Sequence, residues 1–87
     1  MLTRIDVLNA IRNNMLLVME EEFDADAFDP ALSMHDLGAN SLEMVEIVSR
    51  TMRELNVKVP RVRLNRVTNI DELADEFMRV VSVPEQS

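Results

Sequence analysis

Asp36-Leu37-Gly38-Ala39-Asn40-Ser41-Leu42-Glu43 is the stretch in which the chain passes from a loop to a helix. It contains the only glycine of the 87 residues, three positions before a serine. Asn40 is a preferred N-cap residue, and Glu43 completes a capping box. The sequence therefore predicts that Ser41 lies exposed in the first turn of a helix. The amides and the dipole at this end favour negative charge, so a phosphate on the Ser41 hydroxyl would be well tolerated.

The helix that begins at Ser41 is expected to run to Leu55, because this segment contains no Gly or Pro. It carries two apolar stripes at helical spacing, and a helix with one buried face needs only one. The second stripe is either a docking surface or a partly buried face in a small bundle. The stripe expected to face the core is Met44, Ile47, Val48, Thr51 and Leu55, and the second is Leu42, Val45, Ser49 and Met52.

Periodicity predicts another amphipathic helix over about residues 4–20, with Thr3 as its cap and Asp6 three positions later. Its polar side is expected to include Arg12, Asn13 and Asn14. Its apolar face is expected to consist of Ile5, Leu8, Ile11, Met15, Val18 and Met19.

A last helix is predicted over about residues 69–81, capped by Thr68 with Asp71 or by Asn69 with Glu72. Between the two later helices, Pro60 favours a break, and a short helix is expected at about 61–66. Residues 82–87 are expected to form a frayed tail. The inward stripe of the last helix is expected to be Ile70, Leu73, Ala74, Phe77, Val80 and Val81.

The segment 21–40 is predicted to be a long loop that begins in a run of six acids. We interpret this run as a solvated surface, because it lacks the glycine and the spacing of a calcium loop. Spaced apolar residues are expected to pin the loop to the helices. These anchors are Phe23, Phe28, Leu32 and Leu37.

Composition narrows the function classes. A chain of 87 residues is expected to form a single domain, residues 1–87. Its net charge of −7 argues against a nucleic-acid partner. One His and no Cys leave almost no ligands for a transition metal, so no metal site is expected. The absence of a long apolar run or a secretory signal predicts a cytoplasmic protein without membrane contact.

Charge is unevenly distributed along the chain. The segment 50–66 holds six of the nine basic residues and one acid, and we call it the basic island. It could steer an anionic group or a partner. Alternatively, it forms salt bridges with the acidic loop, which is the interpretation we prefer. The basic residues are Arg50, Arg53, Lys58, Arg61, Arg63 and Arg66.

An enzyme is not expected, and no residue is predicted to be catalytic. A Ser–His–Asp set could be imagined from Ser41, His35 and Asp36. However, Asp36 directly follows His35, and neither a glycine-rich oxyanion loop nor a nucleophile elbow is present.

The stretch Asp36-Leu37-Gly38-Ala39-Asn40-Ser41-Leu42 and the helix after it resemble the prosthetic-group motif of acyl carrier proteins. The resemblance covers almost the whole chain. It implies an all-α four-helix bundle of three longer helices and one short helix. It also implies that Ser41 carries 4′-phosphopantetheine, installed from coenzyme A by a separate phosphopantetheinyl transferase. Since the chain has no Cys, the thiol for an acyl thioester must come from this arm.

The family resemblance also implies a docking surface on the helix that starts at Ser41. The docking residues expected here are Asn40, Leu42, Glu43, Val45, Glu46, Ser49, Arg50 and Arg53. Two features depart from the usual pattern: Asn40 replaces an Asp, and the basic island replaces an acidic region.

Within the family, the chain is most similar to freestanding donor carriers of polyketide β-branching cassettes. That similarity implies a monomer that delivers acetyl groups to an enzyme related to hydroxymethylglutaryl-CoA (HMG-CoA) synthase. The alternatives are a generic fatty-acid or polyketide carrier, served by a ketosynthase or acyltransferase, and a helical interaction domain that carries nothing.

Overall fold

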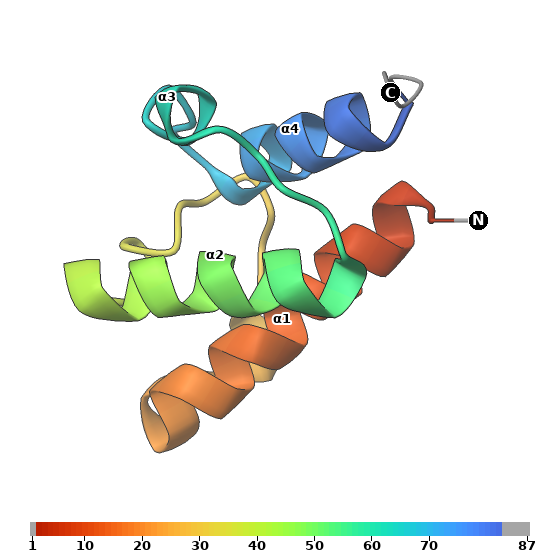
Figure 1. Cartoon of the computed structure of the whole chain (residues 1–87). Coiled ribbons are helices and arrows are strands. Elements are labelled where there is room, and N and C mark those ends of the chain that lie inside the picture. Colours follow the sequence, from red (N-terminus) through yellow and green to blue (C-terminus); the bar gives the residue numbers. More distant parts are fainter. Residues whose placement is uncertain (1, 83–87) are drawn as a thin grey trace.

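The computed structural model describes residues 2–82. Of the tail expected at 82–87, Ser82 is instead the last residue of the final helix, and 83–87 lie outside the described residues. Within residues 2–82 the chain is helical and contains no strand. The expected all-α architecture of three longer helices and one short helix is confirmed (Figure 1). The α-helices are α1 (Arg4–Met19), α2 (Ser41–Leu55), α3 (Arg61–Leu64) and α4 (Ile70–Ser82), and two 3-10 turns, η1 (Glu20–Glu22) and η2 (Ala25–Ala27), follow α1.

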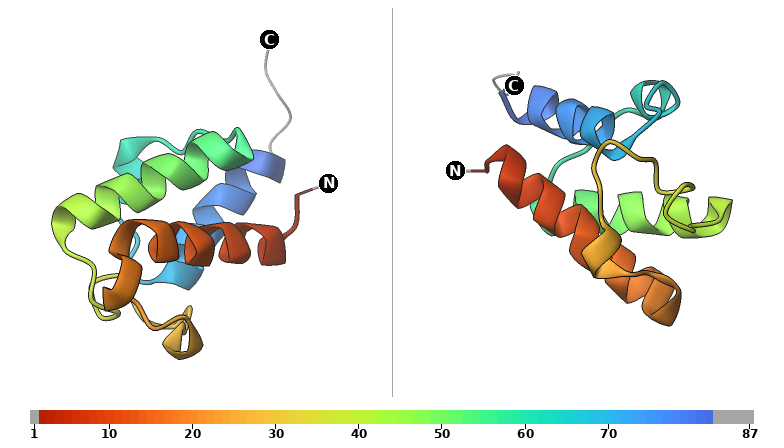
Figure 2. Two further views of the ribbon diagram at one scale, coloured as in Figure 1. Left: turned by 90° about the horizontal axis from the view of Figure 1, so that it is seen from below. Right: turned by 180° about the vertical axis from the view of Figure 1, so that it is seen from behind.

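Helix α1 is the central support of the bundle, because both α2 and α4 pack against it. In the views of Figure 2, α2 crosses α1 on one side and α4 lies on another, while α3 is a short element near α4. None of the helices in the described part of the chain combines the length and the apolar character that crossing a membrane requires.

The predicted N-caps of α1 and α2 are formed. The Thr3 hydroxyl accepts a hydrogen bond from the Asp6 amide at 3.2 Å, and the Asp6 carboxylate accepts one from the Thr3 amide at 2.9 Å. The pKa of Asp6 lies below its usual value, because hydrogen bonds from the Thr3 amide and, second, from the Thr3 side chain favour the ionised carboxylate. At α4 the second alternative is the one observed, since Asn69 Oδ1 accepts from the Glu72 amide at 2.8 Å.

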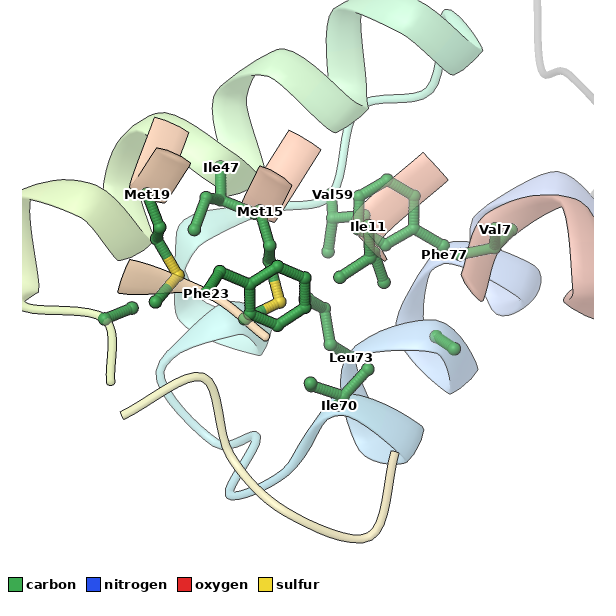
Figure 3. Close-up of a cluster of buried hydrophobic side chains, with 12 residues drawn as sticks. Val7, Ile11, Met15, Met19, Phe23, Ile47, Val59, Ile70, Leu73 and Phe77 are labelled. Carbon is green, nitrogen blue, oxygen red and sulfur yellow. The ribbon is translucent and has the colours of Figure 1, made fainter. Parts of the chain in front are cut away.

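The core lies where α1, α2 and α4 meet (Figure 3). The first side of the core comes from α1, the second from Ile47 of α2, and the third from Ile70, Leu73, Ala74 and Phe77 of α4. Val81 was also expected on the inward stripe of α4 but is exposed, so that prediction is wrong for the last turn of the helix. Val59, in the link between α2 and α3, and Phe23, after η1, complete the core. The buried apolar residues are Val7, Ala10, Ile11, Met15, Met19, Phe23, Ala39, Ile47, Val59, Ile70, Leu73, Ala74 and Phe77.

Two predictions about the faces of α1 are wrong. Ile5 was expected in the core but is 69% exposed, and Val7 takes the buried position in that turn. Asn14 was expected on the polar side but is buried, with 3% of its surface exposed. The row of buried residues on α1 is thus rotated toward α2 relative to the prediction. Asn14, the polar residue in this row, forms hydrogen bonds with Thr51 and Glu54 of α2.

Three of the four predicted apolar anchors of the long loop, Phe23, Phe28 and Leu37, lie in or against the core as predicted. Phe23 is buried and meets the half-buried Phe28 edge-on, with ring centroids 6.3 Å apart. Leu32, an expected apolar anchor, is 38% exposed. Its backbone fastens the loop instead, since the Leu32 carbonyl accepts from the Ile70 amide at 3.0 Å and the Pro30 carbonyl accepts from the Asp71 amide at 2.8 Å. These bonds satisfy two of the free amides at the start of α4.

The acids of the loop face solvent, as predicted for Glu20 to Asp29. Asp24 and Asp29 accept hydrogen bonds from backbone amides two residues ahead, which stabilises local turns. Among the described residues, no group of three or more His, Asp or Glu side chains is placed to hold a metal ion.

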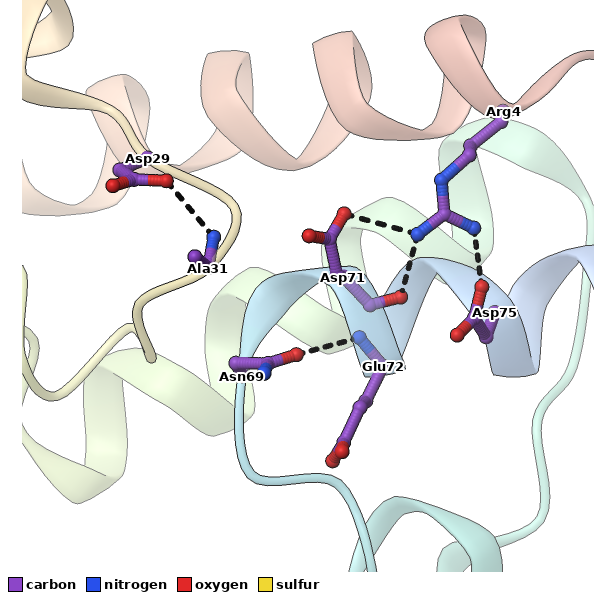
Figure 4. A network of polar contacts seen from close by, with 7 residues as sticks. All are labelled: Arg4, Asp29, Ala31, Asn69, Asp71, Glu72 and Asp75. Carbon is purple, nitrogen blue, oxygen red and sulfur yellow. Dashed lines mark hydrogen bonds and ion pairs between the residues drawn. The ribbon is translucent and has the colours of Figure 1, made fainter.

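A polar clamp joins the start of α1 to α4 (Figure 4). The Arg4 guanidinium pairs with the Asp71 carboxylate at 3.0 Å, donates to the Asp71 carbonyl at 3.0 Å, and also pairs with Asp75. These partners raise the pKa of Arg4 above its usual value, because each hydrogen bond and negative charge favours the cation. The clamp is partly exposed, so it contributes mainly orientation rather than stability.

Candidate functional site

Ser41 is the first residue of α2, and its side chain is exposed. The turn before it is held by a complete capping box. The Asn40 amide donates to Glu43 Oε1 at 2.9 Å, and the Glu43 amide donates to Asn40 Oδ1 at 2.8 Å. The predicted cap is therefore confirmed, and it fixes the direction in which the Ser41 hydroxyl leaves the helix.

The loop that presents Ser41 is held by a second reciprocal pair. The Ser33 amide donates to Asp36 Oδ2 at 3.2 Å, and the Asp36 amide donates to Ser33 Oγ at 2.9 Å. The amide of Ala39, whose side chain is buried, then donates to the Met34 carbonyl at 2.9 Å. These bonds hold the loop against the bundle immediately before Ser41.

Gly38 lets the chain turn into this helix. Its φ of +107° lies in a region that residues with a side chain rarely adopt. Space is not the constraint, since an added Cβ would meet Met19 Cε at 3.5 Å, an ordinary contact. The single glycine is therefore required by the backbone conformation.

The side chains around Ser41 do not form a catalytic set. The Asp36 carboxylate is occupied by the Ser33 amide. His35 is exposed, and within residues 2–82 its side chain makes no hydrogen bond to Ser41 or Asp36. The serine is thus presented to solvent without an internal base that could activate it.

The two stripes of α2 differ strongly in exposure. On the stripe predicted to face the core, Ile47 and Thr51 are fully buried, and the other three residues are half-buried. On the second stripe, Leu42 is 83% exposed and Val45 is 64% exposed. The second stripe is therefore open at its beginning, close to Ser41, and becomes half-buried at Ser49 and Met52.

A buried polar cluster holds α2 to α1. Asn14 Nδ2 lies within hydrogen-bond distance of the Ala10 carbonyl at 2.9 Å, Thr51 Oγ1 at 3.1 Å and Glu54 Oε1 at 3.1 Å. Thr51 Oγ1 in turn donates to the Ile47 carbonyl at 2.8 Å. The sequence contained a signal for this cluster, because Val7, Ile11 and Asn14 follow one another at helical steps.

A groove of about 690 Å³ begins at Ser41 and runs along α2. Its other walls come from the loop at 58–60, from α3 and from the start of α4. The floor is largely apolar and rich in flexible side chains, including Met44, Val48, Met52 and Leu64. A flexible chain attached at Ser41 could lie in this groove.

The basic island does not pair with the acidic loop, so the preferred interpretation is wrong for the described residues. Arg50 pairs with Glu46 of its own helix at 3.0 Å, and Arg63 pairs with Glu76 of α4 at 3.4 Å. The acidic run lies beyond the end of α1, whereas the island spans the end of α2 and α3. The other four cations of the island, Arg53, Lys58, Arg61 and Arg66, form no ion pair with residues 2–82.

Comparison with known proteins gives two matches. A family model described as "Phosphopantetheine attachment site" matches residues 5–77. The Bacillus subtilis (strain 168) protein named "Polyketide biosynthesis acyl-carrier-protein AcpK" is 39% identical over 54 residues. That match covers 62% of this chain and 66% of the relative, just under two thirds of its length. No solved structure matches the chain.

Proposed function

The chain belongs to the acyl carrier family whose members hold a phosphopantetheine attachment site, and from this premise we propose that Ser41 is the attachment residue. Membership makes the protein a non-catalytic carrier with a covalently bound phosphopantetheine. When attached, this arm supplies the thiol that holds an acyl group as a thioester.

The environment of the serines supports Ser41. Three serines lie within the matched residues 5–77: Ser33, Ser41 and Ser49. The Ser33 hydroxyl accepts from the Asp36 amide and stabilises a turn, while Ser49 is half-buried beside the groove. Ser41 alone of the three is exposed, and it stands at a helix N-terminus, where a phosphodiester is electrostatically favoured.

The attachment step needs a separate transferase. The Ser41 hydroxyl gives up its proton as Oγ bonds to the phosphorus of coenzyme A. The phosphorus–oxygen bond of the diphosphate breaks, and the nucleotide leaves as adenosine 3′,5′-diphosphate. Since no base is hydrogen-bonded to the Ser41 hydroxyl among the described residues, we propose that the phosphopantetheinyl transferase supplies it. Because the transferase needs coenzyme A, we propose that the carrier lies in the cytoplasm. We also propose that the carrier is a monomer, since a monomer suits a shuttle that visits several enzymes.

For the cargo, we propose that the carrier donates acetyl groups to an HMG-CoA-synthase-like enzyme in polyketide β-branching. The named role of the relative, polyketide biosynthesis, supports the general class. The alternative is a generic polyketide or fatty-acid carrier that serves a ketosynthase or an acyltransferase. In either case the proposed docking residues are Asn40, Leu42, Glu43, Val45, Glu46, Ser49, Arg50 and Arg53.

The exposed stripe of α2 supports this docking surface, because Leu42 and Val45 offer apolar contacts next to Ser41. Tethering on the arm raises the effective concentration of the acyl group at a docked enzyme. Glu43 and Glu46 can meet basic groups, although such contacts are weak at an exposed surface.

The attachment proposal is tested by incubating the protein with coenzyme A, Mg²⁺ and a broad-specificity transferase. The intact mass of the wild type should rise by one phosphopantetheine. Ser41→Ala should gain nothing. Ser49→Ala, the matched control, keeps the Ser41 hydroxyl and loses at most one docking contact, so it should gain the full mass when the reaction is run to completion. A folded wild type that gains no mass would favour a helical interaction domain that carries nothing.

The donor role has a separate test. The acetyl-loaded protein and an acetyl-loaded fatty-acid carrier are offered to an HMG-CoA-synthase-like enzyme, and transfer is followed by mass spectrometry. We expect faster transfer from this protein. Equal rates would remove the case for a dedicated donor and favour the generic carrier.

A further inference from the structure

Three exposed cations lie along the groove that begins at Ser41 or in the hollow next to it, and we call Arg53, Lys58 and Arg61 the cationic rim. Lys58 and Arg61 line the same groove as Ser41. Arg53 and Lys58 share a second, shallower hollow beyond Ser49. The three side chains therefore form one continuous surface from the end of α2 to the start of α3.

The cationic rim is electrostatically unsatisfied within the described chain. Arg50 is paired with Glu46, and Arg63 is paired with Glu76. In contrast, Arg53, Lys58 and Arg61 are exposed and form no ion pair with any residue between 2 and 82. Three unpaired cations along the groove and the hollow that lead away from Ser41 are not needed to stabilise the fold of an otherwise acidic protein.

From these observations we propose that the cationic rim docks against an acidic patch on the enzyme that accepts the acyl group, next to the entrance of its active site. Val45, which lines the groove on α2, and Val62 of α3, next to the lining residue Arg61, expose 64% and 63% of their surfaces. Apolar contacts surrounded by arginine are typical of protein interfaces. A protein surface can satisfy both the apolar and the cationic parts.

A polyanion fits less well. The chain carries a net charge of −7, and Glu43 and Glu46 lie on the same helix as Arg53. An extended strand of phosphates or an anionic membrane would meet these acids as well as the cations. A partner protein can instead place basic groups opposite the start of α2 and acidic groups opposite the cationic rim. Such complementarity would also fix the orientation in which Ser41 approaches the active site.

This inference rests on the proposed donor function, and the HMG-CoA-synthase-like enzyme is the probe. Arg61→Glu is compared with Arg12→Glu, which makes the same charge change on α1, away from the groove. Each variant is loaded with acetyl-phosphopantetheine, and its loading is verified by intact mass before transfer is measured. Loss of loading thus cannot be mistaken for loss of docking.

We expect Arg61→Glu to raise the KM for the loaded carrier roughly tenfold with little change in kcat, because charge reversal at a docking surface weakens association. Arg12→Glu should retain the wild-type KM. Arg61→Lys keeps the positive charge, so its KM should lie close to the wild-type value. Added NaCl should raise the wild-type KM more than that of Arg61→Glu, because salt screens the attraction. Unchanged helical circular dichroism would show that the variants are folded.

Equal KM values for Arg61→Glu and Arg12→Glu would overturn the inference, and so would a lower KM for Arg61→Glu. Cosedimentation of the wild type with phosphatidylglycerol vesicles, lost in Arg61→Glu, would assign the surface to a membrane and overturn the inference as well. No transfer from a fully loaded wild type would refute the donor role and this inference with it. That outcome is distinct from normal transfer without charge dependence, which refutes the inference alone.

Discussion

The two faces of α2 show how one helix serves both folding and presentation. On the face turned toward α1, Ile47 and Thr51 are fully buried. On the other face, Leu42 and Val45 expose more than half of their surface although both are large apolar residues. Apolar character alone therefore does not decide which face is buried. The packing of α1 decides it, and the remaining face stays available beside Ser41.

The polar groups show the same contrast. Asn14 and Thr51 are buried between α1 and α2, and their hydrogen bonds fix how the two helices meet. On the exposed face, the pair of Glu46 and Arg50 is open to solvent and contributes little to stability. A rigid buried face with an adaptable exposed face suits a protein that several enzymes must recognise. Substitutions on the two faces should therefore differ in their effect on the free energy of unfolding.

The largest effect is expected for Ile47→Asp. The side chain is fully buried in the core, where a carboxylate would lack both water and a partner. Such a change typically costs more than about 4 kcal/mol, which is comparable to the whole stability of a small domain. We expect the helical circular dichroism signal to be largely lost at pH 7.

The control for this variant is Ile47→Val, which removes one methylene and should cost only about 1 kcal/mol. A cooperative urea transition for Ile47→Asp near the wild-type midpoint would show that this face of α2 is not the core. The assignment of the two stripes would then have to be exchanged.

A smaller loss is expected for Asn14→Ala. The substitution removes the amide that contacts Ala10, Thr51 and Glu54 and leaves a small cavity between α1 and α2. Losing a buried hydrogen-bonded group of this kind costs about 2–3 kcal/mol. Urea denaturation followed by circular dichroism would measure it.

The neighbouring Asn13 is exposed, so Asn13→Ala serves as the matched control and should change the free energy of unfolding by less than about 0.5 kcal/mol. Equal effects of the two substitutions would mean that the buried cluster does not hold the helices together.

Asn14 also marks what the sequence could and could not predict. Features that depend only on residues close together in the sequence were predicted correctly. The caps at Thr3 and Asn40 are examples, because each involves a partner only three positions away. The core-facing stripe of α2 follows from its spacing in the same way. Asn14 was misplaced because a polar residue is normally assigned to solvent, whereas its partners Thr51 and Glu54 are distant in sequence.

The other differences have the same origin. The long loop is held by backbone bonds from Leu32 and Pro30 to the start of α4, and backbone groups leave no trace in a pattern of side chains. The pairing of Arg63 with Glu76 likewise depends on how α3 and α4 meet. At the candidate site, the position of Ser41 was predictable from its local motif. The groove beside it was not, because α2, α3 and α4 form it jointly.

The smallest effect on stability, and the most informative for function, is expected for Val45→Asp. Val45 is 64% exposed and precedes the fully buried Ile47 by two residues. Because Asp and Val have similar helix propensities and the site is solvated, the free energy of unfolding should change by less than about 1 kcal/mol. Acetyl transfer to the acceptor enzyme should nevertheless fall roughly tenfold, since an apolar contact at the centre of the proposed docking surface becomes charged.

Leu17→Asp provides a closely matched comparison, because Leu17 of α1 is also 64% exposed but lies away from Ser41 and its groove. It should leave both stability and transfer near the wild-type values. If Leu17→Asp impairs transfer as much as Val45→Asp, the loss reflects added negative charge rather than position, and the exposed face of α2 has no special role in docking. If Val45→Asp unfolds the protein, the face beside Ser41 contributes to the core, and one helix would not divide folding from presentation in the way proposed.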